Sequence, residues 1–277
     1  MSIASSPFDR FRTRSLLKWP LPLIILAIII TGEATESSLL VVHRNIIFGF
    51  EIDVIIGIWI FLQCRRHSIS IQRLVRTIPS EHWNWAYLSL ALPLFLLSIG
   101  IVWVNLWLRH LLLLRFGPSV ATSWLGHHPA FLPGTPLRTV VLLFQGVVLS
   151  PIVEELQYRG LFLHRWERKW GRTVALIATS LVFAIIHKDL LAAFVFGLVM
   201  AVLYLRTRTL LVPIACHGFY NALVTGSQAI RAVGNWWNGP LCLAASVPIL
   251  LGFLYRYWPP PEACLPYYLP GEISGTD

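Results

Sequence analysis

Two adjacent glutamates lie in the middle of an apolar stretch of this chain. Glu154 and Glu155 belong to the segment Ser150–Gly160, which has apolar runs on both sides. Glu155 and Arg159 are four residues apart, so on a helix they share a face and can form an ion pair. Glu154 is rotated by about 100° from Glu155 on the same helix and points elsewhere. It is therefore the carboxylate left to act as a general base.

Two histidines follow on later apolar segments, and their positions relate them to the glutamates. The midpoint between Glu154 and His187 falls at Trp170–Gly171, where basic residues and a glycine mark the turn of a helical hairpin. Antiparallel helices joined there would hold Glu154 and His187 at the same depth, and we expect them to face each other. His217 and Asn221 are four residues apart, so both point the same way from a third helix.

These side chains have the chemistry of a peptide hydrolase. Glu154 and His187 can remove a proton from a water molecule and direct the hydroxide at a carbonyl carbon. His217 and the Asn221 amide can donate hydrogen bonds to the oxyanion that results. The sequence lacks the H-E-x-x-H and G-x-S-x-G motifs of other hydrolases. One carboxylate and two imidazoles could also bind zinc, and each buried polar group alone could be structural, so both alternatives stay open.

The composition indicates which kind of fold holds these groups. Hydrophobic residues make up 56% of the 277 residues and charged residues 13%, against roughly 25% charged in an average soluble domain. A charged side chain at the centre of a bilayer costs at least about 2.5–3.5 kcal/mol, so the charges in apolar runs are candidates for function. We predict an all-α, polytopic membrane helix bundle of about eight transmembrane helices, which cover residues 17–31, 46–63, 85–108, 137–168, 173–188, 189–205, 209–227 and 240–257.

Basic residues predict the orientation of this bundle. With the N-terminus in the cytoplasm, 15 Lys and Arg residues lie on the cytoplasmic side and 6 on the other side. This asymmetry follows the positive-inside rule, so we expect both termini in the cytoplasm. The expected location of the bundle is a bacterial plasma membrane. The net charge of +9 then needs no nucleic-acid partner. The expected partners are the lipid bilayer and a membrane-associated protein or peptide substrate.

Three motifs in this order resemble those of a known family. Glu154-Glu155-x-x-x-Arg159, Phe183-x-x-x-His187 and His217-x-x-x-Asn221 are similar to the motifs of the CPBP family of intramembrane glutamic endopeptidases. That family includes the type II CAAX prenyl endopeptidase and bacterial relatives linked to bacteriocin self-immunity. The resemblance covers residues 137–227, which we predict to be the protease core. Residues 1–136 are predicted to form N-terminal membrane helices and a loop without a matched motif, and residues 228–277 a last transmembrane helix and an irregular tail.

The resemblance also implies roles for the matched residues. Glu154 would activate water with His187, and His217 with Asn221 would form the oxyanion hole. The supporting residues would be Glu155, Arg159 and Phe183, and no metal or other cofactor would be needed. The substrate would be membrane-associated, and a lipidated protein with a CAAX-like end is one option.

Two other classes of function stay open, together with the role of two acidic residues. The chain could be a catalytically silent immunity or scaffold protein of the same fold, or a transporter or channel that uses its buried charges, although no inverted repeat is visible. Glu51 and Asp53 lie in the second apolar run and have no assigned role. Either they line a cavity, or the helix begins after them and leaves them at the surface.

Overall fold

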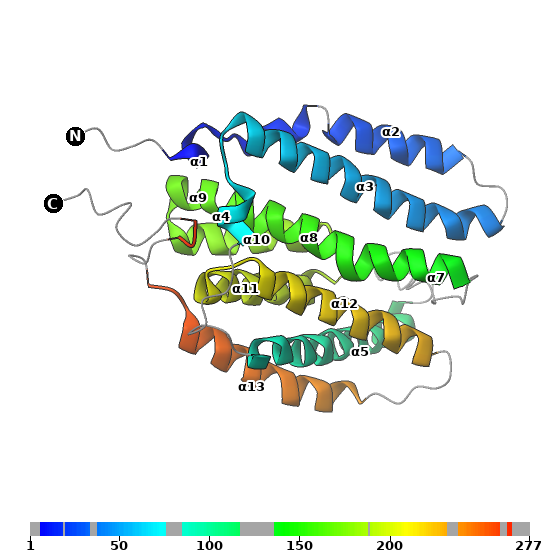
Figure 1. The fold of residues 1–277 in the computed structure, drawn as a ribbon. Coiled ribbons are helices and arrows are strands. Elements are labelled where there is room, and N and C mark those ends of the chain that lie inside the picture. Colours follow the sequence, from blue (N-terminus) through cyan, green and yellow to red (C-terminus); the bar gives the residue numbers. More distant parts are fainter. Residues whose placement is uncertain are drawn as a thin grey trace.

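The chain folds into a bundle of helices in the computed structural model (Figure 1). The structure describes residues 6–18, 20–33, 38–75, 85–116, 136–187, 189–231, 238–260 and 265–267. Within these ranges the chain forms helices and connecting turns and no strand. The prediction of an all-α bundle is confirmed.

Each of the eight predicted apolar runs coincides with a long helix or helical run. The elements are α1 (Pro7–Arg10), η1 (Thr13–Leu17), α2 (Pro20–Glu33), α3 (Ser38–Arg66), α4 (Ile71–Val75), η3 (Trp85–Leu90), α5 (Ala91–Phe116), α7 (Pro136–Leu143), η4 (Phe144–Leu149), α8 (Ser150–Glu155), η5 (Leu156–Phe162), α9 (Leu163–Trp170), α10 (Arg172–Ile185), α11 (Leu190–Thr207), α12 (Leu211–Arg231) and α13 (Gly239–Tyr257). The run from α7 to α9 is one helical rod, because each of its elements starts where the preceding one ends. The short elements α1, η1 and α4 were not predicted, since none of them is a long apolar run.

Four helices among the described residues are long and apolar enough to cross a membrane. They are Ala86–Arg115, Thr139–Trp170, Leu190–Thr207 and Gly239–Tyr257. These helices confirm a polytopic membrane protein, while the number of eight crossings stays a prediction. Most of the predicted loop between residues 115 and 137, and most of the predicted irregular tail, lie outside the described residues.

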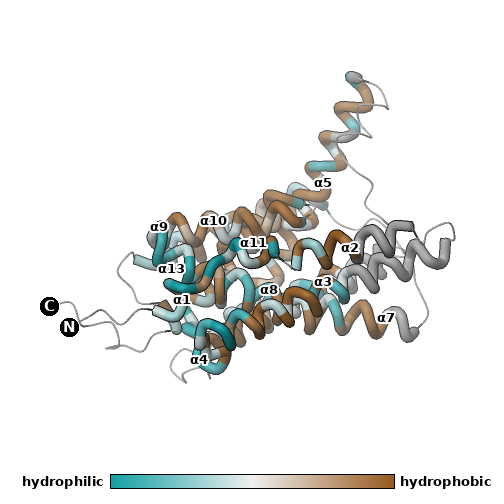
Figure 2. Tube along the Cα trace, turned by 90° about the horizontal axis from the view of Figure 1, so that it is seen from above, coloured by the Kyte–Doolittle hydropathy of each residue, from teal (hydrophilic) through white to brown (hydrophobic). Residues whose placement is uncertain are grey.

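The bundle has an ordered arrangement of helices around a buried centre. In Figure 1, α2 and α3 form one side, α5 and α13 form the opposite side, and the run from α7 to α12 lies between them. The centre of the core is α11, which packs along α10 and is fully buried from Val199 to Tyr204. Figure 2 shows hydrophilic residues gathered at the end of the bundle that carries α1, α4 and α9. The site described below lies along the middle rod of this arrangement.

The first described residues dock onto the hydrophilic end of that rod. The ring of Phe8 is fully buried and stacks on His164 of α9 at 4.7 Å. The same ring meets Tyr267, near the other end of the chain, at 5.0 Å. Arg168 donates two hydrogen bonds of 2.9 Å to the Asp9 carboxylate, and this guanidinium holds the pKa of Asp9 below its usual value. Both described ends of the chain therefore lie on one side of the bundle, and the assignment of that side to the cytoplasm stays a prediction.

Candidate active site

The helix that carries the two glutamates is interrupted by wide turns on both sides of them. Glu154 and Glu155 lie in α8, between the π-helical segments η4 and η5. At the end of each π segment the chain bonds five residues back, as the Ser150 N–H does to the Gln145 carbonyl. Such turns change the direction of the side chains that follow and are frequent at functional sites. The apolar pattern of residues 137–168 did not predict them.

Glu155 is the hub of the site. Its Oε1 accepts a hydrogen bond of 2.8 Å from Arg159 Nη1, and the same oxygen lies 2.9 Å from His217 Nδ1. The Glu155 side chain is fully buried, and the ion pair that its spacing from Arg159 predicts is present. Two residues on α8 and η5 thereby hold a histidine on α12.

Arg159 connects this hub to two further helices. Its Nη2 donates to the carbonyl of Gly197 on α11 at 3.0 Å. Its guanidinium lies over the ring of Phe183 on α10, 5.0 Å from the centroid. A guanidinium above an aromatic face gains a cation–π interaction, which is stronger when water is excluded. The supporting residues of the sequence analysis are thus in contact with one another.

Glu154 approaches the same histidine from its other nitrogen. Its Oε2 lies 3.8 Å from His217 Nε2, which is longer than an ordinary hydrogen bond. Among the described residues this oxygen has no hydrogen-bond partner. The Glu154 side chain is 20% exposed, whereas that of Glu155 is 0% exposed. Glu154 is therefore the more accessible carboxylate of the two, and its nearest imidazole is that of His217.

His187 lies just beyond the end of α10 and contacts the site through Phe183. Its ring stacks on Phe183 at 4.2 Å, and its Nδ1 lies 2.6 Å from the Phe183 carbonyl oxygen. The Phe183 ring also meets the ring of His217, at 6.2 Å between centroids. Among the described residues no hydrogen bond or ion pair within 4.0 Å joins His187 to Glu154. A carbonyl at Nδ1 favours the tautomer with hydrogen on Nδ1, which leaves Nε2 as an acceptor.

Asn221 lies one turn after His217 on α12 and binds the wide turn before the glutamates. Its Nδ2 donates to the carbonyl of Gly146 in η4 at 2.7 Å. The helices approach closely here, since a Cβ at Gly218 would lie 2.5 Å from the Val147 carbonyl oxygen. Only glycine lets α12 come this near to η4, and the sequence analysis missed that role of Gly218. The common face of His217 and Asn221 is thus turned toward the rod that carries Glu154.

Asp53 is a further acidic group beside the site. It is 6% exposed and accepts hydrogen bonds from Gln145 and Ser150. The alternative that the second helix begins after this residue is wrong, because α3 begins at Ser38 and buries it. The sequence feature that pointed to Asp53 was the presence of a carboxylate in an apolar run.

No metal centre is evident in the described part of the chain. Among those residues no group of three or more His, Cys, Asp or Glu side chains has a geometry that could hold a metal ion. The zinc alternative therefore gains no support from the arrangement of side chains. The expectation that the reaction needs no cofactor stays a prediction.

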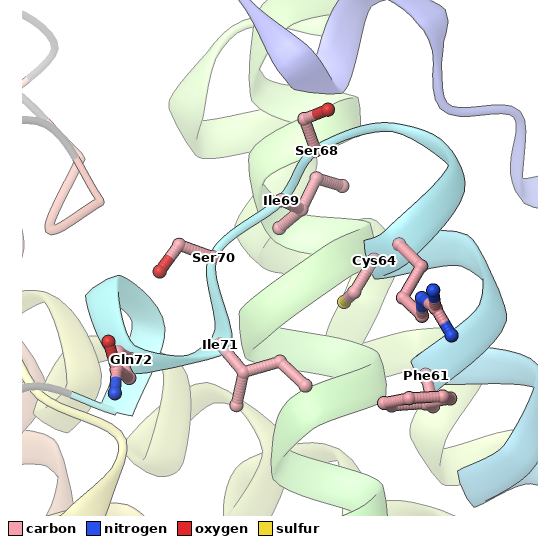
Figure 3. A pocket seen from close by; sticks show the side chains of 8 residues that line it. Phe61, Cys64, Ser68, Ile69, Ser70, Ile71 and Gln72 are labelled. Carbon is pink, nitrogen blue, oxygen red and sulfur yellow. The ribbon is translucent and has the colours of Figure 1, made fainter.

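A pocket of about 390 Å³ lies elsewhere, where α3 turns into α4. Figure 3 shows its lining, which includes Phe61, Cys64, the connecting residues Ser68 to Ser70 and Ile71 at the start of α4. None of the candidate catalytic residues lines it. The pocket is therefore separate from the group of glutamates and histidines.

The fold and the site define a polytopic helical membrane protein with a buried centre of carboxylates and imidazoles. Residues 136–223 match the family described as type II CAAX prenyl endopeptidase Rce1-like. This match confirms the resemblance that the three motifs indicate, and the matched segment contains every candidate catalytic and supporting residue.

One curated relative shares part of the chain. It is the UPF0177 protein YbdI of Lactococcus lactis, which is 32% identical over 121 residues. The similar region makes up 42% of this chain and 65% of that protein, so the comparison does not extend to the whole of either protein. No solved structure gives a significant match. The division of the chain at residues 136 and 227 stays a prediction.

Proposed function

We propose that this chain is an intramembrane endopeptidase in which Glu154 activates the hydrolytic water. The observation that carries the proposal is the position of the two glutamates around one imidazole. Glu155 binds one nitrogen of His217 and is held by Arg159. Glu154 faces the other nitrogen with an oxygen that has no hydrogen-bond partner in the described part of the chain. The Rce1-like family match over the same residues supports a protease.

The proposed reaction is a hydrolysis without a covalent intermediate. Glu154 takes a proton from water, and the resulting hydroxide adds to the carbonyl carbon of the scissile peptide bond. His187 assists through Nε2, since its Nδ1 is bound to the Phe183 carbonyl. When the tetrahedral intermediate collapses, the carbon–nitrogen bond breaks and the proton held by Glu154 passes to the leaving amine. The products are a new carboxylate and a new amine.

The oxyanion of the intermediate needs hydrogen-bond donors. His217 would donate through Nε2 as an imidazolium, because its Nδ1–H is already bound to the Glu155 carboxylate. Asn221 can donate as well, because one amide hydrogen binds the Gly146 carbonyl and the second is left over. Loss of one such donor typically slows acyl transfer by about 100- to 1,000-fold. Both donors come from one face of α12, so they would act on the same oxygen.

The proposed substrate is a membrane-associated protein or peptide, and the family description supports a lipidated one with a CAAX end. The bilayer is the proposed second partner, and a bacterial plasma membrane with both termini in the cytoplasm is the proposed setting. No metal or other cofactor is proposed for the reaction.

The test uses purified protein in liposomes with a quenched, farnesylated peptide that ends in a CAAX sequence. We expect cleavage by the unaltered protein, and a loss of at least about 100-fold in Glu154→Ala and in His187→Ala. Arg168→Ala, on the exposed part of α9, serves as the control and should cleave normally. Full activity in either of the two variants would contradict the mechanism.

A second measurement tests the proposal without the need to choose a substrate. Membranes of cells that express the unaltered protein are compared with membranes that express Glu154→Ala, by mass spectrometry of protein termini. New termini found only with the unaltered protein would support proteolysis. Identical sets of termini would favour the catalytically silent immunity or scaffold protein.

A further inference from the structure

Asp53 is a buried carboxylate that lies outside the segment matched by the family. It belongs to α3, whereas the match begins at residue 136. Its Oδ2 accepts from Gln145 Nε2 at 3.0 Å and from the Ser150 hydroxyl. Gln145 Nε2 also lies 3.1 Å from Ser150 Oγ, so the three side chains form a closed triangle of hydrogen bonds. A buried carboxylate is costly unless donors satisfy it, and here two donors do so.

The packing of α3 brings Asp53 close to the rod that carries the glutamates. Gly49 and Gly57 lie one turn before and one turn after Asp53, on the same face of α3. A Cβ at Gly49 would lie 2.8 Å from Gln145 Nε2, and one at Gly57 would lie 3.7 Å from Val153. The face of α3 formed by these three residues therefore runs alongside η4 and α8.

The two partners of Asp53 lie in the stretch of helix directly before Glu154 and Glu155. Gln145 belongs to the π segment η4, and Ser150 is the first residue of α8. Ser150 and Glu154 are four residues apart, so they share a face of α8. Because Asn221 binds the neighbouring Gly146 carbonyl, η4 is held by α3 on one side and by α12 on the other.

We propose that Asp53 is a positioning residue for the catalytic glutamate. Its hydrogen bonds to Gln145 and Ser150 fix the wide turn that sets the direction of Glu154 toward His217. This role rests on the function proposed above. It also assigns to the N-terminal helices, which carry none of the family's motifs, a direct part in shaping the active site.

Activity measurements on designed variants test this role. With the farnesylated CAAX peptide in liposomes, we expect Asp53→Ala to lower kcat on the order of 10- to 100-fold, because a small misplacement of a reacting group costs that much. KM should stay within about twofold, since Asp53 does not touch the substrate. Glu51→Gln is the matched control and should leave kcat unchanged, because Glu51 lies two residues away on another face of α3.

A rescue experiment separates positioning from a general loss of packing. Gln145→Glu keeps the shape but puts a second carboxylate opposite Asp53, where the two like charges repel, so kcat should fall. Combining it with Asp53→Asn restores one carboxylate and one amide with donor and acceptor exchanged, and kcat should rise by at least about fivefold over Gln145→Glu alone. If Asp53→Ala does not fold, Ser150→Ala carries the same test, because it removes one of the two donors to Asp53.

Hydrogen exchange gives a readout that does not depend on activity. Asp53→Ala should speed amide exchange in residues 144–150, and Glu51→Gln should not.

The possible outcomes distinguish this inference from the proposed function. If the unaltered protein and Glu154→Ala behave alike toward the peptide, the proposed function fails, and exchange in residues 144–150 alone decides whether Asp53 holds η4. If Glu154→Ala is inactive but Asp53→Ala keeps its kcat, only the inference about Asp53 fails. The absence of rescue in the double variant, with Gln145→Glu folded and impaired, would also overturn it.

Discussion

Arg159 offers the sharpest test of how the site is held together. Replacing it by leucine removes the 2.8 Å bond to Glu155 and the 3.0 Å bond to the Gly197 carbonyl. The Glu155 side chain is fully buried, and its Oε2 has no partner among the described residues, so its charge would be left with His217 alone. Breaking a buried ion pair by removing one partner costs about 3–5 kcal/mol. We therefore expect Arg159→Leu to unfold at a much lower temperature.

The size of the effect can be stated for a thermal assay. At roughly 2–4 °C per kcal/mol, the expected decrease in Tm is on the order of 10 °C. The assay is thermal unfolding of the purified protein in detergent, followed by tryptophan fluorescence. Arg168→Leu is the matched control. Its ion pair with Asp9 is partly exposed, and such pairs contribute less than about 1 kcal/mol.

A double variant identifies the cause of the loss. Glu155→Gln combined with Arg159→Leu leaves no unpaired charge in the core, so it should recover at least about 1 kcal/mol relative to Arg159→Leu alone. A Tm of Arg159→Leu that stays within the range of the Arg168→Leu control would refute the reasoning. Equal losses in the single and double variants would show that packing, and not the stranded carboxylate, determines the stability.

Two more predictions concern helix contacts. Gly218→Ala should destabilise the protein by about 1–3 kcal/mol, because its Cβ would lie 2.5 Å from the Val147 carbonyl oxygen. Gly226→Ala on the same helix is the control and should not destabilise it, because a Cβ there meets no described atom within 4 Å. Equal Tm values for the two variants would contradict the close approach of α12 to η4. The ion pair with Arg168 lowers the pKa of Asp9 in the folded protein. The stabilisation from this ion pair is therefore fully present above the normal pKa of about 3.8, and it is lost as the pH falls through the lowered pKa of the folded state. Hydrogen exchange in residues 6–11 should therefore rise on acidification, and should rise less in Asp9→Asn, whose segment is already loosened at neutral pH.

The bundle could be predicted from the sequence because apolar runs of sufficient length specify membrane helices. The pairing of Glu155 with Arg159 was also predictable, since it depends on the spacing of two residues on one helix. A hairpin at Trp170–Gly171 relates only the depths of Glu154 and His187 along their helices. Depth does not fix how a helix is rotated about its own axis, and this rotation decides which imidazole a side chain faces. The equal depths therefore could not indicate that the imidazole nearest to Glu154 is that of His217.

Contacts between distant parts of the chain were beyond the sequence analysis. No local sequence pattern distinguishes the π turns η4 and η5 from a regular helix. Asp53 could be flagged as a costly charge, but its partners Gln145 and Ser150 are fixed by helix packing across 92 and 97 residues. The docking of Phe8 onto His164 likewise depends on tertiary structure.

Cleavage by Glu154→Gln is the most direct test of the central claim. This substitution keeps the size of the side chain and removes its ability to accept a proton from water. In single-turnover cleavage of the farnesylated CAAX peptide by protein in liposomes, we predict a rate at least about 100-fold below that of the unaltered protein. Glu51→Gln, with the same chemical change on α3, should cleave within about twofold of normal. A Glu154→Gln rate equal to that of the Glu51→Gln control would contradict the role of Glu154 as the catalytic base.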